Sequence, residues 1–362
     1  MRKIIFIVNS IDNQRCRKRV DEFRSNGYLV KVYGINRGLK TTAWPECEII
    51  ASYENKMAYK DRMKILKNAL KEVFKKHREE NDVIWYFFGL DIAMFGVLYN
   101  RKRRFIYEES DLVHTYMGNK MAIWAMERID KFIIARSSLT VLTSEGFAEY
   151  HYNSKRPSNL VIKPNKLNPQ VVNVPDVPDV IIDTNHLNFA LVGMIRFEAV
   201  RRMADVISRN FPKHQFHFFG VLNVATKKEE EGFMVLDERE NVHFHGRFKN
   251  PDELPLVYSQ IDVVVSTYDV ENVNVQYAEP NKLYESIYYR TPIIVSKGTF
   301  LAKQVERFHS GYAVDVSDDQ NIISLVHQIE NDIHDVKKEL ESIDRSVAVD
   351  RCEELLKRVS VI

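Results

Sequence analysis

Residues 279–296 read "EPNKLYESIYYRTPIIVS", a short helical stretch that runs into an apolar strand through the turn "YRTP". Pro280 suits the first turn of a helix, because the N–H that proline lacks would have no partner there. Apolar and aromatic residues then recur at three- and four-residue spacing, the pattern of a helix with one buried face. The segment therefore predicts a helix followed by a strand, which is the repeating unit of α/β proteins.

The same alternation extends outward from this segment in both directions. The second half of the chain contains the β-rich runs "LNFALVG", "QFHFFG", "NVHFHG", "DVVVST", "TPIIVS" and "GYAVDV". The first half contains "KIIFIV", "YLVKVYG", "DVIWYF", "RFIYEES" and "LTVLT", and its clearest helical pattern covers residues 58–78. Strands that alternate with helices predict parallel sheets covered on both faces.

A proline-rich stretch separates the two halves. Residues 164–186 hold four prolines and no helical period, which is typical of a linker. A chain of 362 residues is also long for a single core. We therefore expect a first Rossmann-like domain over residues 1–165, a linker over 166–185 and a second domain over 186–345. A C-terminal helix at about 346–362 is expected to pack back on the first domain.

The composition is that of a globular protein, with 45% hydrophobic and 28% charged residues. No apolar run has the length of a signal peptide or a membrane span. Three cysteines, Cys16, Cys47 and Cys352, show no metal-ligand spacing and are expected to be free thiols. These features predict a cytoplasmic protein.

The charge is distributed unevenly along the chain. Residues 1–165 contain 30 Lys and Arg against 19 Asp and Glu, whereas residues 166–362 contain 22 against 31. A basic first half favours an anionic neighbour, either lipid headgroups or a phosphorylated acceptor. We expect peripheral contact with the inner face of a membrane; the alternative is that the basic runs are solvated helix ends and turns. No nucleic-acid motif accompanies the charge, so nucleic acid is not an expected partner.

The common catalytic signatures are absent from the sequence. There is no G-x-x-x-x-G-K-[ST] loop, no G-x-G-x-x-G, no G-x-S-x-G, and no His/Cys cluster with zinc spacing. No Asp-x-Asp follows an apolar strand, so a metal-chelated nucleotide is not indicated. The sequence therefore gives no metal ligands.

Charged residues follow two of the predicted strands in the second half. "LNFALVG" ends at Gly193, and Arg196 with Arg201 stands just beyond it, where two guanidinium groups and helix-end N–H groups would suit a pyrophosphate. In the opening segment Lys282 adds a positive charge, and Glu285 could accept two hydrogen bonds from a ribose diol. The alternative is an ordinary amphipathic helix in which Glu285 is solvated.

In chain order, the segments "LVGMIRFEAVR", "HFFG", "VHFHGRF", "YSQIDVVVSTYD" and "PNKLYESIYYRTPIIVS" resemble GT-B-fold glycosyltransferases. The resemblance is greatest to the retaining, family 4-like enzymes of bacterial capsular and exopolysaccharide synthesis. It is specific over residues 186–316 and loose over residues 1–165. It implies an α/β fold of two Rossmann-like, doubly wound domains that face each other across a cleft.

The resemblance also implies roles for individual residues. Arg196 and Arg201 match the basic pair that contacts the donor diphosphate and stabilises the leaving group. Glu285 matches the second glutamate of an E-x7-E pair, which binds the ribose. The donor nucleotide site implied in this way comprises Gly193, Gly246, Arg247, Asn281, Lys282 and Glu285.

One position departs from the family's pattern. The first glutamate of the E-x7-E pair falls at position 277, which is Tyr277. Glu279 and Glu271 are the nearby carboxylates that could replace it through a shifted loop. Tyr268, Tyr277 and Glu279 are accordingly expected to face the transferred sugar.

The first half is expected to bind the acceptor. "YEESDLVH" follows a predicted strand, and the resemblance implies an acidic residue or a histidine in this region, which makes Asp111 and His114 candidate catalytic groups. Glu109 and, after the first strand, Arg15 and Arg19 are the candidates for acceptor contact.

These observations predict a hexosyltransferase-like glycosyltransferase. It would move a sugar from a UDP- or GDP-type nucleotide diphosphate sugar, as co-substrate, to a glycan or lipid-linked acceptor in cell-surface polysaccharide synthesis. The resemblance implies retention of configuration and a reaction without metal or other cofactor. A non-catalytic GT-B-like protein that binds a nucleotide or a glycan is the alternative.

Overall fold

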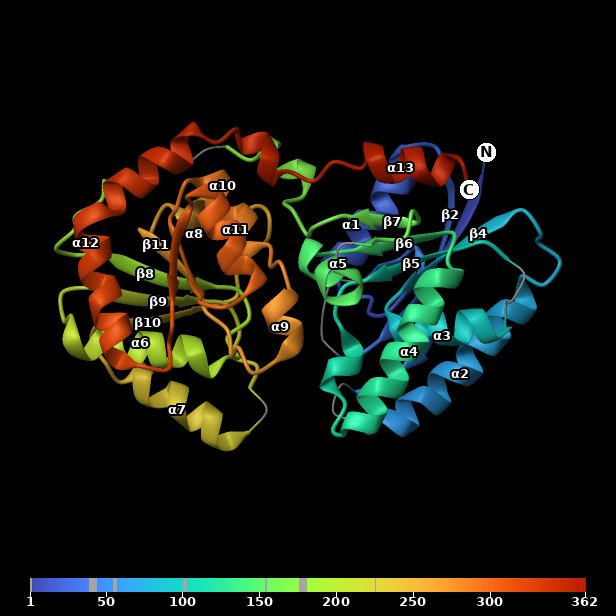
Figure 1. The fold of residues 1–362 in the computed structure, drawn as a ribbon, viewed down its shortest axis with the longest axis horizontal. Coiled ribbons are helices and arrows are strands. Elements are labelled where there is room, and N and C mark those ends of the chain that lie inside the picture. The colour runs from blue at the N-terminus through green and yellow to red at the C-terminus, as the bar shows by residue number, and fades with distance from the viewer. Residues whose placement is uncertain are drawn as a thin grey trace. The chain divides into compact units, whose positions relative to one another are not determined.

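The computed structural model describes residues 2–38, 44–54, 57–99, 103–153, 155–175, 181–224 and 226–362. The chain divides into two compact units (Figure 1). Unit 1 comprises Met1–Pro164 and Arg351–Ile362, and unit 2 comprises Asn165–Asp350. Each unit is built on its own parallel sheet with helices on both faces, which confirms the predicted α/β architecture of two doubly wound domains.

The sheet of unit 1 has seven parallel strands among the described residues, in the order β3-β2-β1-β4-β5-β6-β7. The strand order reverses between β1 and β4, which is where ligands of such sheets bind, outside the carboxyl ends. The strands are β1 Lys3–Val8, β2 Leu29–Asn36, β3 Cys47–Ser52, β4 Val83–Phe88, β5 Phe105–Glu109, β6 Leu139–Leu142 and β7 Leu160–Ile162.

Helices cover both faces of this sheet. On one face α2, α3 and α4 bury apolar side chains, and on the other face α1 and α13 do so. The amphipathic pattern of residues 58–78 forms α2, with Leu66, Leu70 and Phe74 buried. The helical segments are α1 Gln14–Ser25, α2 Tyr59–Lys76, α3 Leu90–Tyr99, η1 Val113–Tyr116, α4 Lys120–Arg136, α5 Glu145–Tyr152 and α13 Glu353–Ser360.

Unit 2 repeats this plan with six parallel strands among its described residues, in the order β10-β9-β8-β11-β12-β13. Here the strand order reverses between β8 and β11. The strands are β8 Asn188–Val192, β9 Gln215–Phe219, β10 Val242–Gly246, β11 Val263–Ser266, β12 Ile293–Ser296 and β13 Gly311–Val314.

The faces of the second sheet are also both covered. One face packs against α6, α7 and α12, and the other against α8, α10 and α11 (Figure 1). The opening segment of the sequence forms α10 and β12, as predicted. The helical segments are η2 Pro169–Asn173, α6 Glu198–Asn210, α7 Lys227–Asp237, α8 Leu254–Tyr258, α9 Val273–Tyr277, α10 Lys282–Tyr289, α11 Phe300–Phe308, α12 Asp319–Ser342 and η3 Arg345–Ala348.

The stretch expected to be a linker is partly built into unit 2. Leu167 and Val171 are buried in the cluster that also contains α10. The backbone N–H of Leu167 donates to the carbonyl of Ala348 at 3.0 Å, and that of Asp350 donates to the carbonyl of Leu167 at 2.9 Å. The two segments that lead from one unit to the other are therefore hydrogen-bonded together. Residues 176–180 of the expected linker lie outside the described residues.

The last helix of the chain, α13, belongs to unit 1. Leu355 and Val359 are buried in the same cluster as Ile4 and Phe6 of β1. The guanidinium of Arg2 donates to the carbonyl of Val359 at 3.2 Å. The core of unit 1 therefore contains residues from both ends of the chain.

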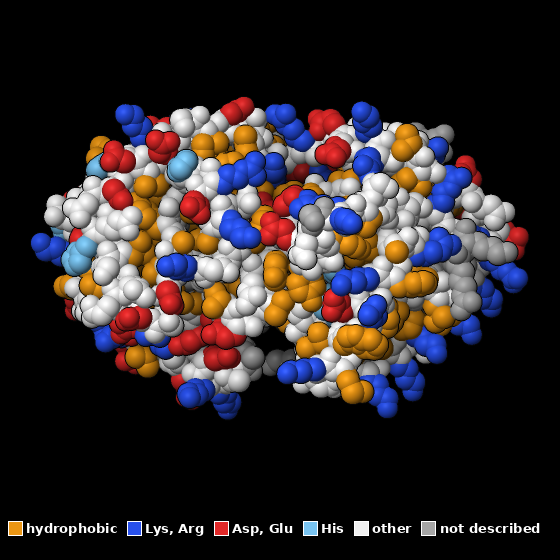
Figure 2. Space-filling model, viewed as in Figure 1, with side chains coloured by type: hydrophobic (Ala, Val, Ile, Leu, Met, Phe, Trp, Pro, Cys, Tyr) orange, Lys and Arg blue, Asp and Glu red, His pale blue; other side chains and the backbone are white. Residues whose placement is uncertain are grey.

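Charge is also unequal on the surface. On the face drawn in Figure 2, Lys and Arg side chains gather over unit 1, whereas acidic side chains gather near α6 and α7 of unit 2. Among the described residues, no helix is both long enough and apolar enough to span a bilayer.

Candidate functional site

Two glycines let elements of unit 2 approach closely at the carboxyl end of its sheet. Gly193 follows β8 with φ +129°, and Gly220 follows β9 with φ +151°. A Cβ atom on Gly220 would overlap the carbonyl oxygen of Gly193, and one on Gly193 would lie 3.4 Å from Cε of Lys282. The glycines therefore bring the end of β8 against the start of α10, two of the elements predicted to form the donor site.

The predicted residues of α10 form one buried network. The carboxylate of Glu285 accepts hydrogen bonds from the hydroxyl of Tyr258 at 2.8 Å, from Nζ of Lys282 and from Nδ2 of Asn281. Its side chain is 0% exposed. Three donors therefore orient the carboxylate, and a carboxylate has about four lone-pair sites.

The residues predicted to face the sugar lie near this network. Tyr277 is the last residue of α9 and is half-buried. Glu279 is buried and accepts a hydrogen bond from the hydroxyl of Tyr284, whose ring lies 5.3 Å from Nζ of Lys166. The other carboxylate weighed for this role, Glu271, is exposed.

Arg196 and Tyr268 both contact the aromatic ring of Phe197. The guanidinium carbon of Arg196 is 4.6 Å from the ring centre of Phe197, and that ring packs edge-on against Tyr268 at 4.7 Å between centres. The hydroxyl of Tyr268 accepts a hydrogen bond from Ser266 at the end of β11. The loops after β8 and β11 are thereby joined at the point where the strand order reverses.

Arg201 does not converge with Arg196 as expected. Arg201 lies one turn into α6, where Nε is 2.7 Å from one carboxylate oxygen of Glu198, and its Cδ lies against Gly232 of α7. An arginine three residues after a glutamate on a helix pairs with it readily, which explains this direction.

The start of α6 is also occupied by a side chain of unit 2. Asp269, in the loop after β11, accepts a hydrogen bond from the N–H of Ala199 at 2.8 Å and a longer one from that of Glu198 at 3.4 Å. Burial raises the pKa of Asp269, and these two hydrogen bonds oppose the rise. The N–H groups that we expected to meet a diphosphate therefore already hold a carboxyl group.

Two further predicted donor residues are exposed. Gly246 has φ +76° at the carboxyl end of edge strand β10, where a Cβ atom would meet no heavy atom within 4 Å, and Arg247 follows it. Both are accessible at the same end of the sheet as Gly193.

In unit 1 the predicted acceptor residue Arg19 is part of the interior. It is 1% exposed, and it bonds to Glu108 at 3.0 Å and to Glu22 at 2.6 Å. Glu108 also accepts from the hydroxyl of Tyr86, and its other oxygen is 3.8 Å from Nε of Arg15. The guanidinium of Arg19, predicted to contact an acceptor, is therefore buried against carboxylates in this structure.

Glu109 and His114 are likewise buried, so neither side chain is presented to an acceptor. His114 Nδ1 is 3.3 Å from Oδ2 of Asp130, and Glu109 Oε2 accepts from Nε2 of His151 at 2.9 Å. Asp111, the other candidate catalytic group, is exposed and is not one of the three groups that converge here. The expected grouping of Glu109, Asp111 and His114 is corrected accordingly: the first and last face inward with Asp130.

Burial changes the proton affinity of this cluster. It raises the pKa of Glu109 well above its ordinary value, and the neighbouring carboxyl of Asp130 raises it further. Burial lowers the pKa of His151. Both shifts have the sign expected when charged groups are removed from water.

Sequence reasoning missed several residues of these networks. Asp130 and His151 lie on helices α4 and α5, far along the chain from Glu109, and Tyr258 lies on α8. No short motif connects them. Asp269 had a usable signal, since "TYD" directly follows a predicted strand of the second half.

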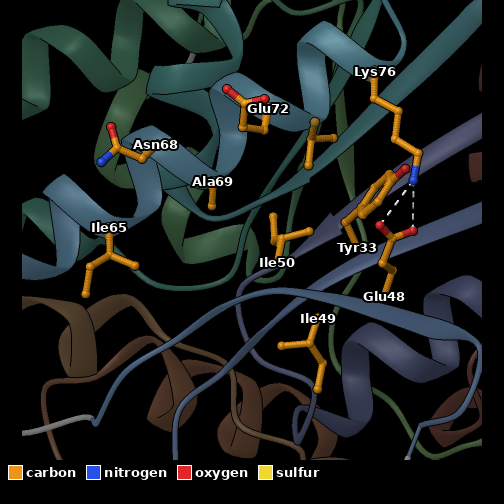
Figure 3. Close-up of a pocket in the computed structure, with 10 residues that line it drawn as sticks. Tyr33, Glu48, Ile49, Ile50, Ile65, Asn68, Ala69, Glu72 and Lys76 are labelled. Carbon is orange, nitrogen blue, oxygen red and sulfur yellow. Dashed lines mark hydrogen bonds and ion pairs between the residues drawn. The ribbon is translucent and has the colours of Figure 1, made fainter.

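A separate cavity of about 590 Å³ lies between β3 and α2 at the edge of the unit 1 sheet (Figure 3). Its apolar lining includes Ile49, Ile50 and Ile65, and the pair of Lys76 Nζ with Glu48 at 3.1 Å crosses one end. None of the predicted site residues lines it. It lies beside an edge strand and not at the carboxyl ends of the strands.

Residues 197–344 match the family model described as Glycosyl transferases group 1. The expected enzyme class is confirmed. The matched segment contains Arg201 on α6, the hydrogen-bond network of Glu285 on α10, and β12. The glycosyltransferase domain therefore coincides with most of unit 2. No curated protein sequence matches the chain.

Solved structures with similar folds extend over both units. Sucrose-phosphate synthase from Thermosynechococcus elongatus shares 15% identity with a TM-score of 0.73, covering 100% of this chain and 98% of that one. HepE from Anabaena, in complex with UDP and glucose, shares 10% identity with a TM-score of 0.70 and full coverage of both chains. The lipopolysaccharide outer core galactosyltransferase WaaB shares 16%, with a TM-score of 0.62 and 94% coverage of each. At these identities the likeness establishes the GT-B fold.

Proposed function

We propose that this glycosyltransferase moves a sugar from a nucleotide diphosphate sugar to a glycan or lipid-linked acceptor of a cell-surface polysaccharide, with retention of configuration. Two solved structures of HepE, one bound to UDP and one bound to UDP-glucose, support a nucleotide-sugar donor of the UDP type. The capsular or exopolysaccharide role and the retaining outcome rest on the sequence resemblance.

The observation that carries the proposal is the junction of Gly193, Lys282 and Glu285. A glycine with φ +129°, a cation and an oriented carboxylate meet at the carboxyl end of β8, beside the reversal of strand order. Lys282 complements a diphosphate, and Glu285 complements a ribose diol. The set matches the two halves of a nucleotide diphosphate.

The chemistry asked of these residues is electrostatic. The bond between the sugar carbon and the β-phosphate oxygen breaks, the acceptor oxygen bonds to that carbon, and its proton goes to the leaving phosphate. Negative charge grows on the diphosphate during this step, and oriented cations stabilise it. We assign that role to Lys282 and Arg196, with no metal ion at the diphosphate. Arg201 contributes less, because Glu198 already neutralises it.

A thermal-shift screen with UDP-, GDP-, ADP- and CMP-sugars tests donor binding, followed by turnover with a crude lipid acceptor. A donor at about a hundred times its dissociation constant adds about 2.7 kcal/mol of stability. Arg196→Ala should lower kcat about 10²- to 10³-fold. Arg201→Ala, the matched control, should lower it far less. Donor affinity should not change between EDTA and Mn²⁺; restoration of lost binding by Mn²⁺ would contradict the assignment.

Two observations favour a second candidate function, a non-catalytic protein that binds a nucleotide or glycan. Tyr277 replaces the first glutamate of the E-x7-E pair, and Asp269 occupies the start of α6. The two functions separate in one assay: a sugar nucleotide that shifts the melting temperature but is never consumed with any acceptor supports the binding protein.

We further propose that unit 1 docks on an anionic bilayer through the outward stripe of α4. Met121, Trp124 and Phe132 are 82%, 61% and 60% exposed, where a surface helix ordinarily carries polar residues. Figure 2 shows hydrophobic side chains together over the region of α4, with Lys and Arg around them. Arg128 lies between the aromatic residues, 5.5 Å from the ring centre of Trp124.

The composition of this stripe favours a membrane over a protein partner. Lys120 and Arg128 are exposed and lie four residues before and after Trp124, so basic and apolar side chains share one side of the helix. Tryptophan with Lys and Arg is the combination that suits an interface of acyl chains and anionic headgroups. A lipid-linked acceptor would be found at that surface.

Co-sedimentation with vesicles of anionic and zwitterionic lipid tests this surface. Binding should require anionic lipid and weaken steeply with salt. The double variant Trp124→Ser and Phe132→Ser should abolish most of it, whereas Met234→Ser, at a 53% exposed apolar position of α7, should not. Binding that is absent, or unaffected by the double variant, would remove the assignment.

A further inference from the structure

Among the buried polar atoms of unit 1 that lack a hydrogen-bond partner among the described residues, three lie in one cluster, and two of these, on His114 and Asp130, face each other at 3.3 Å. The three atoms are Oε1 of Glu109, Nδ1 of His114 and Oδ2 of Asp130. One ligand atom from each residue lies within 4.8 Å of those of the other two. Buried polar atoms of native proteins are nearly always paired, so three together require an explanation.

The other polar atom of each residue is held in place. The hydroxyl of Tyr107 donates to Oδ1 of Asp130 at 3.0 Å, and Nε2 of His151 lies 2.9 Å from Oε2 of Glu109. Nε2 of His114 lies 3.1 Å from the hydroxyl of Tyr150. Outer partners that hold one polar atom of a side chain while its other atom lies near two further ligand atoms are typical of metal ligands.

Among the described residues, the only basic side chains paired with the two carboxyl groups of the cluster are histidines. Both carboxyl groups lie in the interior, and no described Lys or Arg is paired with either of them. Burial of an ionised carboxylate is costly unless it is paired or coordinates a metal. A divalent cation would neutralise both groups at once.

We propose that Glu109, His114 and Asp130 bind one divalent transition-metal ion of the Zn²⁺ type. Nδ1 of His114 and Oδ2 of Asp130 are 3.3 Å apart, which is the edge of a tetrahedron whose bonds are about 2.0 Å long. One imidazole and two carboxylates suit Zn²⁺, and a water molecule would complete four-fold coordination. The ion would lie in the interior of unit 1, held by three buried side chains.

The full-length protein, purified without chelator or metal column, is the material for the test. Elemental analysis after gel filtration should give about one equivalent of Zn²⁺ or a related divalent ion per chain. After EDTA dialysis, added Zn²⁺ should raise the melting temperature in a concentration-dependent manner. Co²⁺ in place of Zn²⁺ should give visible absorption bands of a nitrogen and oxygen site, a readout that needs no variant.

Variants locate the ion. Asp130→Asn and His114→Gln should lose the bound equivalent, and Tyr107→Phe, which removes only an outer partner, should weaken affinity about 10- to 100-fold. His77→Gln is the matched control, because His77 is also a buried histidine of unit 1 paired with a carboxylate, Glu80. It should keep the metal.

Two results would overturn the proposal. One is a parent protein that retains no metal and shows neither a Zn²⁺-dependent melting shift nor Co²⁺ bands, in which case the two carboxyl groups share a proton. The other is equal Zn²⁺ binding by the parent and by Asp130→Asn, which would place the ion elsewhere. Neither result depends on whether the protein transfers a sugar.

Discussion

Each unit buries carboxylate at the carboxyl end of its sheet, but the two units surround it differently. In unit 2, Glu285 receives donors from Tyr258, Lys282 and Asn281, including one cation. In unit 1, Glu109 and Asp130 lie together and receive only neutral donors and imidazoles. The unit 2 carboxylate is complete without a ligand, whereas the unit 1 pair needs a proton or a cation from solution.

The two units show that a buried carboxylate can be stabilised within the protein or can depend on a group from solution. A carboxylate already paired with its own lysine is oriented in advance, so a ligand meets a rigid acceptor. Buried carboxylates without a lysine or arginine partner are costly to ionise, and a bound cation would remove that cost. Substitutions in the two clusters should therefore have opposite effects on stability.

The largest effect is expected from Lys282→Met. It leaves Glu285 buried without its cation and should lower the free energy of unfolding by about 3–5 kcal/mol. Urea denaturation measures the loss. The double variant Lys282→Met and Glu285→Gln removes both charges and should recover much of it. A loss no greater for the single variant than for the double would mean that Glu285 does not depend on Lys282.

Glu285→Gln should weaken nucleotide-sugar binding by roughly 1–3 kcal/mol, because the amide keeps the shape but loses the charged acceptor. Isothermal titration with the donor found by the screen measures this. Glu330→Gln, on α12, is the control and should bind as the parent does. Equal affinity of Glu285→Gln and the parent would make the α10 network purely structural.

Asp130→Asn should act in the opposite direction when metal is removed. Loss of one of two adjacent buried carboxyl groups should raise the free energy of unfolding in EDTA by roughly 1 kcal/mol, because the remaining carboxyl group no longer has a like-charged neighbour. In saturating Zn²⁺ the parent should be the more stable protein. Paired denaturation curves with and without Zn²⁺ decide it: a variant that is less stable than the parent in EDTA would show that Asp130 was already satisfied.

The smallest effect concerns pH and lies in unit 2. Burial, with His243 and His245 nearby, lowers the pKa of His217 to about 4. Its unfolded value is about 6.5, so the neutral form stabilises the fold fully above pH 6.5, and this contribution decreases as the pH falls toward 4. After solvent screening we expect less than about 1 kcal/mol. His217→Phe should reduce the change of the urea midpoint between pH 7.5 and 5. If the midpoint changes with pH as it does in the parent protein, the pH dependence comes from other groups.

Strands buried on both faces were predictable from the sequence, and peripheral strands were not. "KIIFIV" and "DVVVST" are continuous apolar runs because helices cover both sides of them. β3, with the sequence "CEIIAS", is an edge strand with exposed residues, and β7 has three residues, so neither shows a strong pattern. Leu167 and Val171 are buried although their segment has the proline content of a linker.

The candidate site was predictable where its residues are adjacent in sequence. Asn281, Lys282 and Glu285 lie on one turn of α10, and Gly193 ends a clear strand. Other contacts involve residues far apart in the sequence. Asp269 accepts hydrogen bonds from the N–H groups at the start of α6, where we expected a phosphate. Asp130 lies beside Glu109 although it is on a different element, α4. Such contacts follow from the order of the strands, which no local pattern contains.

The position of α13 has a consequence for biosynthesis. Leu355 and Val359 complete the core around β1, yet the ribosome makes them after every strand of unit 2. Unit 2 is continuous from Asn165 to Asp350, so all of its sheet has been synthesised before unit 1 receives its last helix. During translation the first unit to begin is therefore the last to be completed. Until then the apolar surface that α13 covers is open to chaperones or to neighbouring nascent chains.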